Sequence, residues 1–182
     1  MKRGIIILLI GQKGSGKSFI GSLLEIEFNI KFIRVENWAK EIKRNRSIDD
    51  DTYLEDVFRA IEKGVRHEAA NYDSICFEST GLTVQFDKML EQLRKEFNII
   101  TLKILCEPDI CIERIKIRDR HIHINVSDDE IQRINTEVLK RNYRTDFELE
   151  NNAKSYNELI EELGVILKNI SINTPDIKFE RI

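Results

Sequence analysis

The residues from Gly11 to Ser18 read Gly-Gln-Lys-Gly-Ser-Gly-Lys-Ser and match the pattern G-x-x-x-x-G-K-[ST] at every fixed position. The glycines at 11, 14 and 16 permit backbone conformations that other residues rarely adopt, so that backbone N–H groups can surround an anion. The ammonium of Lys17 would neutralise charge on the outer phosphates of a triphosphate, and the hydroxyl of Ser18 would contact Mg²⁺. The pattern therefore predicts a site for a nucleoside triphosphate with Mg²⁺.

Apolar patterns on both sides give this loop its structural context. Residues 5–10 read Ile-Ile-Ile-Leu-Leu-Ile, which is typical of a strand buried on both faces. After the loop, Phe19, Ile20, Leu23 and Leu24 are spaced as on one face of a helix. The N-terminus of that helix would add the positive end of its dipole to the site. The alternative, a glycine turn that binds no ligand, does not explain this agreement of strand, loop and helix.

Composition narrows the class of protein further. A chain of 182 residues suits a single domain over residues 1–182, and its net charge of −3 provides no positive field to attract nucleic acid. The apolar run at 5–10 is too short to cross a bilayer, and no cleavable signal precedes it. The chain has an odd number of cysteines, at positions 76, 106 and 111, and no His or Cys partner lies at the spacing of a metal site. This pattern favours reduced, buried thiols over a metal or redox pair. We therefore expect a cytoplasmic protein without a membrane or nucleic-acid partner.

Strand and helix patterns alternate along the whole chain, which predicts a parallel sheet covered by helices on both faces. The later strands are expected at residues 30–35, 74–78, 99–105 and 147–149. The later helices are expected at 36–44, 53–71, 83–96, from Pro108 onward, from Ser127 onward, and at 156–167 with a possible end near Gly164. A turn at 173–176 and an added strand or docked segment at 177–179 would follow.

With the loop at the start of the chain, five strands and an Arg-rich helix after the fourth, residues 4–169 resemble the small P-loop kinases. These are the adenylate kinase-like and shikimate/gluconate kinase-like enzymes. The resemblance implies an α/β, three-layer P-loop NTPase fold whose five-stranded parallel sheet has the order 2-3-1-4-5. It also implies an acceptor site beside strands two and three, and a small mobile lid at about residues 118–127.

The resemblance extends to residues far from the loop. Arg114 and Arg118 have a spacing that places both guanidiniums on one helix face. Such arginines in the family stack on the adenine and contact the transferred phosphate, although a solvated face paired with nearby acids is the alternative. Asn152 lies in a segment that resembles the loop meeting the nucleotide base. The nucleotide-binding set is therefore Gly11, Gly14, Ser15, Gly16, Lys17, Ser18, Phe19, Arg114, Arg118 and Asn152.

Two subfamily patterns are absent. Adenylate kinases carry Asp-Gly-Phe-Pro-Arg after the third strand, whereas residues 78–81 here read Glu-Ser-Thr-Gly. Shikimate kinases place Asp-x-Asp after the second strand, whereas residues 36–38 read Glu-Asn-Trp, and no Gly-Gly-Gly loop follows the third strand. The absent patterns therefore disfavour both named subfamilies, and they leave the subfamily and the acceptor unassigned.

Two carboxylates follow predicted strands at the edge where open α/β sheets bind ligands. Glu78 could hold Mg²⁺ or act as a base, and Glu36 could orient the acceptor hydroxyl. Each acid also has a purely structural explanation. Glu78 could precede an ordinary turn, and Glu36 could stabilise the start of a helix through the helix dipole. Arg34 and Trp38 could line the acceptor pocket, or Trp38 could belong to the core.

The predicted activity is an ATP-dependent phosphotransferase that moves the γ-phosphate of Mg-ATP to a small cytosolic acceptor, either a metabolite hydroxyl or a nucleoside or nucleotide. The catalytic set is Lys17, Glu36, Glu78 and Arg118, with Ser18 and Glu78 at the metal and ATP and Mg²⁺ as cofactors. A GTP-driven switch is one alternative, but no Asn-Lys-x-Asp motif is present. A nucleotide-binding protein without transfer activity is the other, and the oligomeric state stays open.

Overall fold

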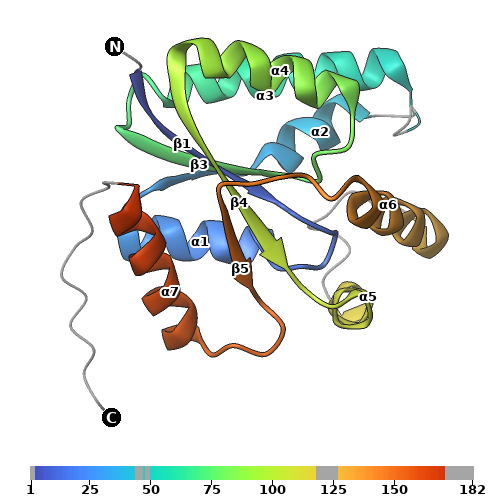
Figure 1. Ribbon diagram of the computed structural model, residues 1–182. Helices are drawn as coiled ribbons and strands as arrows, with labels where there is room; N and C mark the ends of the chain where they lie inside the picture. Colours follow the sequence, from blue (N-terminus) through green and yellow to red (C-terminus); the bar gives the residue numbers. More distant parts are fainter. Residues whose placement is uncertain (1–2, 44–46, 48–49, 118–126, 171–182) are drawn as a thin grey trace.

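The computed structural model describes residues 3–43, 47, 50–117 and 127–170 (Figure 1). The strands are β1 (Arg3–Ile10), β2 (Lys31–Ile33), β3 (Ser74–Ser79), β4 (Phe97–Leu105) and β5 (Phe147–Glu150). The helices are α1 (Lys17–Phe28), α2 (Val35–Lys43), α3 (Asp51–Glu68), α4 (Val84–Glu96), α5 (Pro108–Ile117), α6 (Asp128–Arg141) and α7 (Tyr156–Asn169). The predicted lid, except for Ser127, and the predicted turn and strand beyond residue 172 lie outside the described residues.

The five strands form one sheet in the order β2-β3-β1-β4-β5, and every neighbouring pair is parallel. This confirms the predicted fold class and strand order. Parallel neighbours require crossovers, and the helices of those crossovers cover both faces of the sheet. In Figure 1, α3 and α4 lie on one face, and α1 and α7 lie on the other.

Strand β1 contributes to two separate cores because its side chains alternate between the faces. Ile6, Leu8 and Ile10 pack with the helices α2, α3 and α4. Ile7 and Leu9 pack with α1 and α7 on the opposite face. Burial of both faces explains why this strand reads as an unbroken apolar run rather than an alternating one.

Some element boundaries differ from the predicted ones for identifiable reasons. The edge strand β2 is shorter than expected, because the backbone turns at Arg34, whose carbonyl oxygen accepts from the N–H of Asn37 at 3.1 Å, and α2 begins at Val35. Helix α7 continues through Gly164 to Asn169. Its buried residues Leu159, Ile160, Leu163 and Leu167 hold it on the sheet, and their burial outweighs the helix penalty of about 1 kcal/mol for one glycine.

The parallel arrangement brings the carboxyl ends of the strands to one edge of the sheet. Gly11 follows β1, Glu78 lies at the end of β3, and Asn151 follows β5. Residues that are far apart in the sequence therefore become neighbours at this edge. Over the described part of the chain, no helix has the length and apolar character needed to span a membrane.

The ring of Phe86 connects α4 with α3 and with the segment that leads to β5. It is fully buried and meets the rings of Phe58 and Tyr143 edge-on, at centroid distances of 6.3 and 5.9 Å. We expect Phe86→Ala to lower the free energy of unfolding by about 3–5 kcal/mol, because it removes buried area and leaves a cavity. Val84→Ala on the same helix, 63% exposed, is the matched control and should change it by less than about 0.5 kcal/mol. Urea denaturation measures both, and equal midpoints for the two variants would contradict the assignment.

Candidate active site

The loop between β1 and α1 adopts backbone conformations that require its glycines. Gly14 and Gly16 have φ values of +85° and +93°, in the left-handed region that favours glycine. A Cβ atom on Gly11 would lie only 2.7 Å from the carbonyl oxygen of Ile104 on β4. The sequence pattern thus corresponds to a tightly wound loop held against the end of the sheet.

Lys17 is the first residue of α1 and is only 8% exposed. Its ammonium donates to the carbonyl oxygens of Gly11, at 3.0 Å, and Gln12, at 2.7 Å, so it curls back across its own loop. The Oγ atom of Ser15 and the Nε2 atom of Gln12 are buried without a hydrogen-bond partner among the described residues. The loop therefore combines a fixed positive charge with polar atoms that a ligand or water can satisfy.

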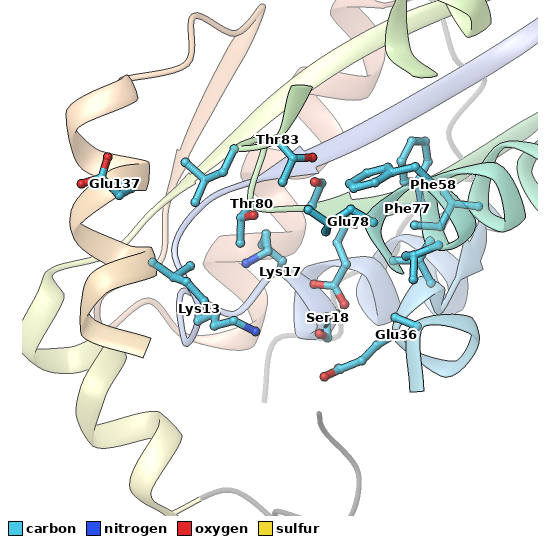
Figure 2. Close-up of a pocket in the computed structure, with 18 of the residues that line it drawn as sticks. Lys13, Lys17, Ser18, Glu36, Phe58, Phe77, Glu78, Thr80, Thr83 and Glu137 are labelled. Carbon is cyan, nitrogen blue, oxygen red and sulfur yellow. Dashed lines mark hydrogen bonds between the residues drawn. The ribbon is translucent and has the colours of Figure 1, made fainter. Parts of the chain in front are cut away.

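Ser18 and Glu78 form a pair of oxygen ligands across the first turn of α1 and the end of β3. The hydroxyl of Ser18 donates to Oε1 of Glu78 at 2.7 Å, and Figure 2 shows the two side chains directed at each other. Hydroxyl and carboxylate oxygens suit Mg²⁺, which usually keeps water and phosphate oxygens as its other ligands. Within the described ranges no group of three or more His, Cys, Asp or Glu side chains could hold a metal by itself. The pair therefore fits a metal that arrives with a nucleotide.

A cavity of about 950 Å³ lies in front of the loop. Lys13, Lys17, Ser18 and Arg114 line the end beside the loop, and residues of α2, α3 and β3 line the end beyond Glu78. Helix α6 also contributes to the wall, with Arg133, Ile134, Glu137, Lys140 and Arg141. Glu36 and Glu78 both line this cavity, as expected for the two acids. The volume is within the range of small-molecule sites.

Asn135 on α6 contacts the loop directly, and sequence reasoning did not select it. Its side chain is only 5% exposed; Oδ1 accepts from the N–H of Lys13 at 2.7 Å, and Nδ2 donates to the carbonyl oxygen of Lys13 at 3.0 Å. The carboxamide thus satisfies both backbone groups of one loop residue. One sequence signal could have identified Asn135: it lies one helical turn after the buried Ile131, so a polar residue occupies the buried face of this helix.

A second asparagine holds the opposite side of the loop. The buried Nδ2 of Asn151 donates to the carbonyl oxygen of Ser15 at 2.9 Å. The guanidinium of Arg114 donates to the carbonyl oxygens of Asn151, at 2.8 Å, and Asn152, at 2.7 Å. The structure therefore brings Arg114 and Asn152 together, and their contacts with the nucleotide stay a prediction. The residue that reaches the loop itself is Asn151, while the side-chain oxygen of Asn152 accepts from the N–H of Glu107.

The described residues that line the cavity do not include Phe19, Arg34 or Trp38. Phe19 is half-exposed on the first turn of α1 and is not part of the wall that the described residues form. Arg34 lies over the Phe32 ring and pairs with Glu25, and Trp38 packs against Gly64, so neither lines the cavity within the described residues. Arg118 lies outside the described residues, and its contact with the transferred phosphate stays a prediction.

The three cysteines are free and buried, which agrees with the expected reduced thiols. Burial, with a hydrogen bond to Cys106, raises the pKa of the Cys111 thiol to about 12. Burial also raises the pKa of the Cys76 thiol well above its ordinary value. Both thiols therefore stay protonated near neutral pH, and the protonated form is a poor nucleophile.

We expect iodoacetamide at about pH 8 to leave Cys76 and Cys111 unmodified in the folded protein, because a raised pKa keeps the reactive thiolate scarce at any pH below it. Peptide mass spectrometry would measure the labelling of each cysteine. The same protein unfolded in urea is the control and should be labelled at both positions. Labelling of either thiol at the unfolded rate in the native protein would contradict their burial.

Asn135→Ala tests the anchoring of the loop by α6. Loss of both hydrogen bonds leaves two backbone groups of Lys13 without their partner, and we expect the Kd for a non-hydrolysable ATP analogue to rise about ten-fold. Gln132→Ala, on the exposed side of the same helix, is the matched control and should bind as the wild type does. Calorimetric titration measures both, and an unchanged Kd for Asn135→Ala would show that the loop keeps its conformation without this contact.

Comparisons with known proteins agree with this geometry. The shikimate kinase family model matches residues 13–167 of the chain. The shikimate kinase of Staphylococcus haemolyticus is 30% identical over 170 residues, which cover 89% of this chain and 94% of that protein. The resemblance to small P-loop kinases is thereby confirmed, and the activity is ATP-dependent phosphotransfer to a small metabolite.

Solved structures show the same fold at low sequence identity. The shikimate kinase of Bacteroides thetaiotaomicron aligns with a TM-score of 0.64 at 17% identity, covering 90% of this chain and 98% of that one. The shikimate kinase of Acinetobacter baumannii in complex with shikimate also aligns with a TM-score of 0.64, at 15% identity, covering 92% of this chain and 95% of that one. The absent motifs had argued against the shikimate kinases, and that interpretation is wrong, because the family model matches most of the chain: this chain belongs to the shikimate kinase family.

Proposed function

We propose that the protein transfers the γ-phosphate of Mg-ATP to a hydroxyl group of a small metabolite that binds between α2 and α3. The observation that carries this proposal is the Ser18–Glu78 pair at 2.7 Å beside the buried Lys17, because all three line one cavity with room for two substrates. The family match supports the reaction class. ATP and the acceptor would enter opposite ends of this cavity.

The phosphate end is built from one loop and its supports. The backbone of residues 11–16 would surround the β- and γ-phosphates, and Lys17 would exchange its carbonyl partners for phosphate oxygens. Ser18 and Glu78 would hold Mg²⁺, which neutralises charge on the phosphate oxygens when it is bound. Arg114 and the Asn152 segment would lie at the nucleotide base, with Arg118 as a further phosphate contact.

Glu36 is the better placed of the two acids to receive the acceptor proton. Glu36 lies in the first turn of α2 and lines the proposed acceptor end, whereas Glu78 lies beside Ser18 and is the candidate metal ligand. In the transfer, the acceptor oxygen forms a bond to the γ-phosphorus and the bond from that phosphorus to the bridging oxygen of ADP breaks. The hydroxyl proton passes to Glu36, and ADP leaves with the bonding electrons.

Shikimate is the acceptor that the family name supplies, and the Acinetobacter baumannii relative binds it. It is therefore the first acceptor to test with this chain. We further propose a single domain working in the cytoplasm, where ATP is available and where three free buried thiols stay reduced.

Glu36→Gln separates the proposed base from the nucleotide site. We expect the rate of phosphotransfer to fall by about 10²–10⁴, because the acceptor loses its proton acceptor, while the Kd for an ATP analogue changes less than about two-fold. Glu41→Gln, an exposed acid on the same helix, is the matched control and should leave both unchanged.

Lys17→Ala should differ from Glu36→Gln by weakening the binding of ATP itself. We expect it to raise the Kd for the ATP analogue and to lower kcat/KM by about 10²–10³. Single-turnover kinetics and calorimetry with each variant measure the two effects. Wild-type transfer by Glu36→Gln would exclude it as the base, and wild-type Mg-ATP use by Lys17→Ala would overturn the proposed nucleotide site.

A further inference from the structure

We infer that Cys106 and Cys111 form an oxidisable pair of thiols, and that the disulfide between them weakens nucleotide binding by disturbing the supports of the glycine loop. The pair lies where β4 passes into α5, outside the residues proposed to bind the substrates. Formation of the disulfide depends on the two cysteines alone, whereas its effect on nucleotide binding rests on the proposed function. The oxidant that such a site takes is a hydroperoxide.

The first turn of α5 brings the two cysteine side chains together. The N–H of Cys111 donates to the carbonyl oxygen of Glu107 at 3.0 Å, so Glu107 is the N-cap residue and Pro108 is the first residue of the helix. Cys106 therefore immediately precedes the N-cap, and Cys111 is the fourth helical residue. Side chains at these two positions often pack against each other and fix the direction in which the chain enters a helix.

The contacts of the two thiols agree with this geometry. The thiol of Cys111 donates to the carbonyl oxygen of Cys106 at 3.9 Å, and the two side chains share a hydrogen bond. Both are buried, free thiols. A disulfide needs Cβ atoms about 3.5–4.5 Å apart, a separation that two contacting side chains reach by a small movement. The pair is therefore close enough to be joined by an S–S bond.

Cys106 is the thiol that reacts with the oxidant. Nη1 of Arg114 donates to its Sγ at 3.4 Å, and the positive end of the α5 dipole lies beside it. Cys106 is 9% exposed, whereas Cys111 is fully buried. Burial, the hydrogen bond with Cys106 and the negative charge of a Cys106 thiolate all raise the pKa of Cys111. Cys111 therefore stays a thiol while Cys106 is oxidised.

The reaction proceeds in two balanced steps. The Cys106 thiolate attacks one peroxide oxygen, so that an S–O bond forms, the O–O bond breaks and the departing hydroxide takes up a proton to become water. The sulfur of Cys111 then attacks the sulfur of this sulfenic acid. The S–S bond forms, the S–O bond breaks, and the oxygen leaves as a second water with the proton of Cys111. Two thiols have then lost two electrons, and the peroxide has gained them.

The backbone of Cys111 supports one side of the glycine loop. A Cβ atom on Gly14 would lie 2.3 Å from the carbonyl oxygen of Cys111 and 3.0 Å from its Cα atom. Gly14 also has a φ of +85°, so this part of the loop has a conformation that favours glycine and leaves no space beside α5. A displacement of Cys111 therefore acts directly on the loop.

The side chain of Cys106 supports the other side of the loop through Arg114. Nη1 of Arg114 donates both to Sγ of Cys106 and, at 2.8 Å, to the carbonyl oxygen of Asn151. The side chain of Asn151 in turn donates to the carbonyl oxygen of Ser15. A displacement of Cys106 therefore changes the position of the guanidinium that holds this segment.

The disulfide requires one of these displacements. An S–S bond is about 2.0 Å long, well inside the contact distance of two separate sulfur atoms, so at least one cysteine moves when the bond forms. Movement of Cys111 disturbs the contact with Gly14, and movement of Cys106 disturbs the contact with Arg114. We therefore expect the oxidised protein to bind the phosphates less tightly, and a thiol reductant to restore the binding.

Peptide mass spectrometry detects the disulfide directly, because trypsin releases both cysteines in one peptide of residues 104–114. After the folded protein is treated with hydrogen peroxide, this peptide should be lighter by the mass of two hydrogen atoms. Cys76 lies in a different tryptic peptide and is the internal control that should stay a free thiol. In Cys111→Ala the sulfenic acid of Cys106 has no second thiol to attack it, so dimedone should trap it. Cys106→Ala should give no dimedone adduct at Cys111.

Calorimetric titration with a non-hydrolysable ATP analogue measures the effect on binding. We expect the Kd of the wild type to rise at least about ten-fold after peroxide treatment and to return after dithiothreitol. Cys106→Ala, compared with its own untreated form, is the matched control and should show no change. It also reports oxidation elsewhere, such as at Met89 in the cavity wall.

The outcomes separate this inference from the proposed function. If the reduced wild type does not bind the ATP analogue, the proposed function fails, and the effect of the disulfide on nucleotide binding fails with it. If the analogue binds but the peptide of residues 104–114 keeps its mass, or Cys76 is oxidised equally fast, the inference is overturned and the proposed function stands. A disulfide that leaves the Kd unchanged, or an equal rise of the Kd in Cys106→Ala, also overturns the inference.

Discussion

The parallel pairing of β1 with β3 determines the geometry of the whole site. In its register Leu9 lies opposite Glu78 and Ile10 opposite Ser79, so the glycine loop leaves the sheet beside the acid. The hydrogen bond between Ser18 and Glu78 is a consequence of this register, because α1 starts directly after the loop. A shift by one residue would turn the acid to the other face of the sheet, and the two oxygens would no longer meet.

Carboxamide groups, rather than charges, fix the loop from both sides. Asn135 and Asn151 come from α6 and from the end of β5, and each bonds the backbone of a loop residue. An amide can donate and accept at once without adding charge near the phosphates, so the charges of the segment from Gly11 to Ser18 are those of Lys13 and Lys17. A Cβ atom on Gly16 would lie 2.2 Å from Nδ2 of Asn151, so the glycine and the asparagine fit only as a pair.

The cavity joins two different environments. Its loop end offers backbone N–H groups and ammonium to a polyanion, and its far end offers the apolar faces of α2 and α3. Phosphoryl transfer needs a reaction site shielded from water, since water competes with the acceptor hydroxyl. Under the proposed function, the apolar walls beyond Glu36 and Glu78 would provide such shielding.

The amino-acid sequence determined the class of fold, the sheet order and the phosphate loop. These features depend on local patterns, such as the apolar run at 5–10 and the glycines at 14 and 16, or on a resemblance that covers most of the chain. The positions of Glu36 and Glu78 after their strands also followed from the rule that parallel strands present their carboxyl ends at one edge.

Only the tertiary structure could show that Asn135 and Asn151 reach the loop, because each contact joins residues more than a hundred positions apart. The apolar lining of the cavity beyond Glu78 was likewise undetermined in the sequence. Its residues read as ordinary core positions of an amphipathic helix, and only the packing of α2, α3 and β3 decides that this face borders a cavity instead of being filled.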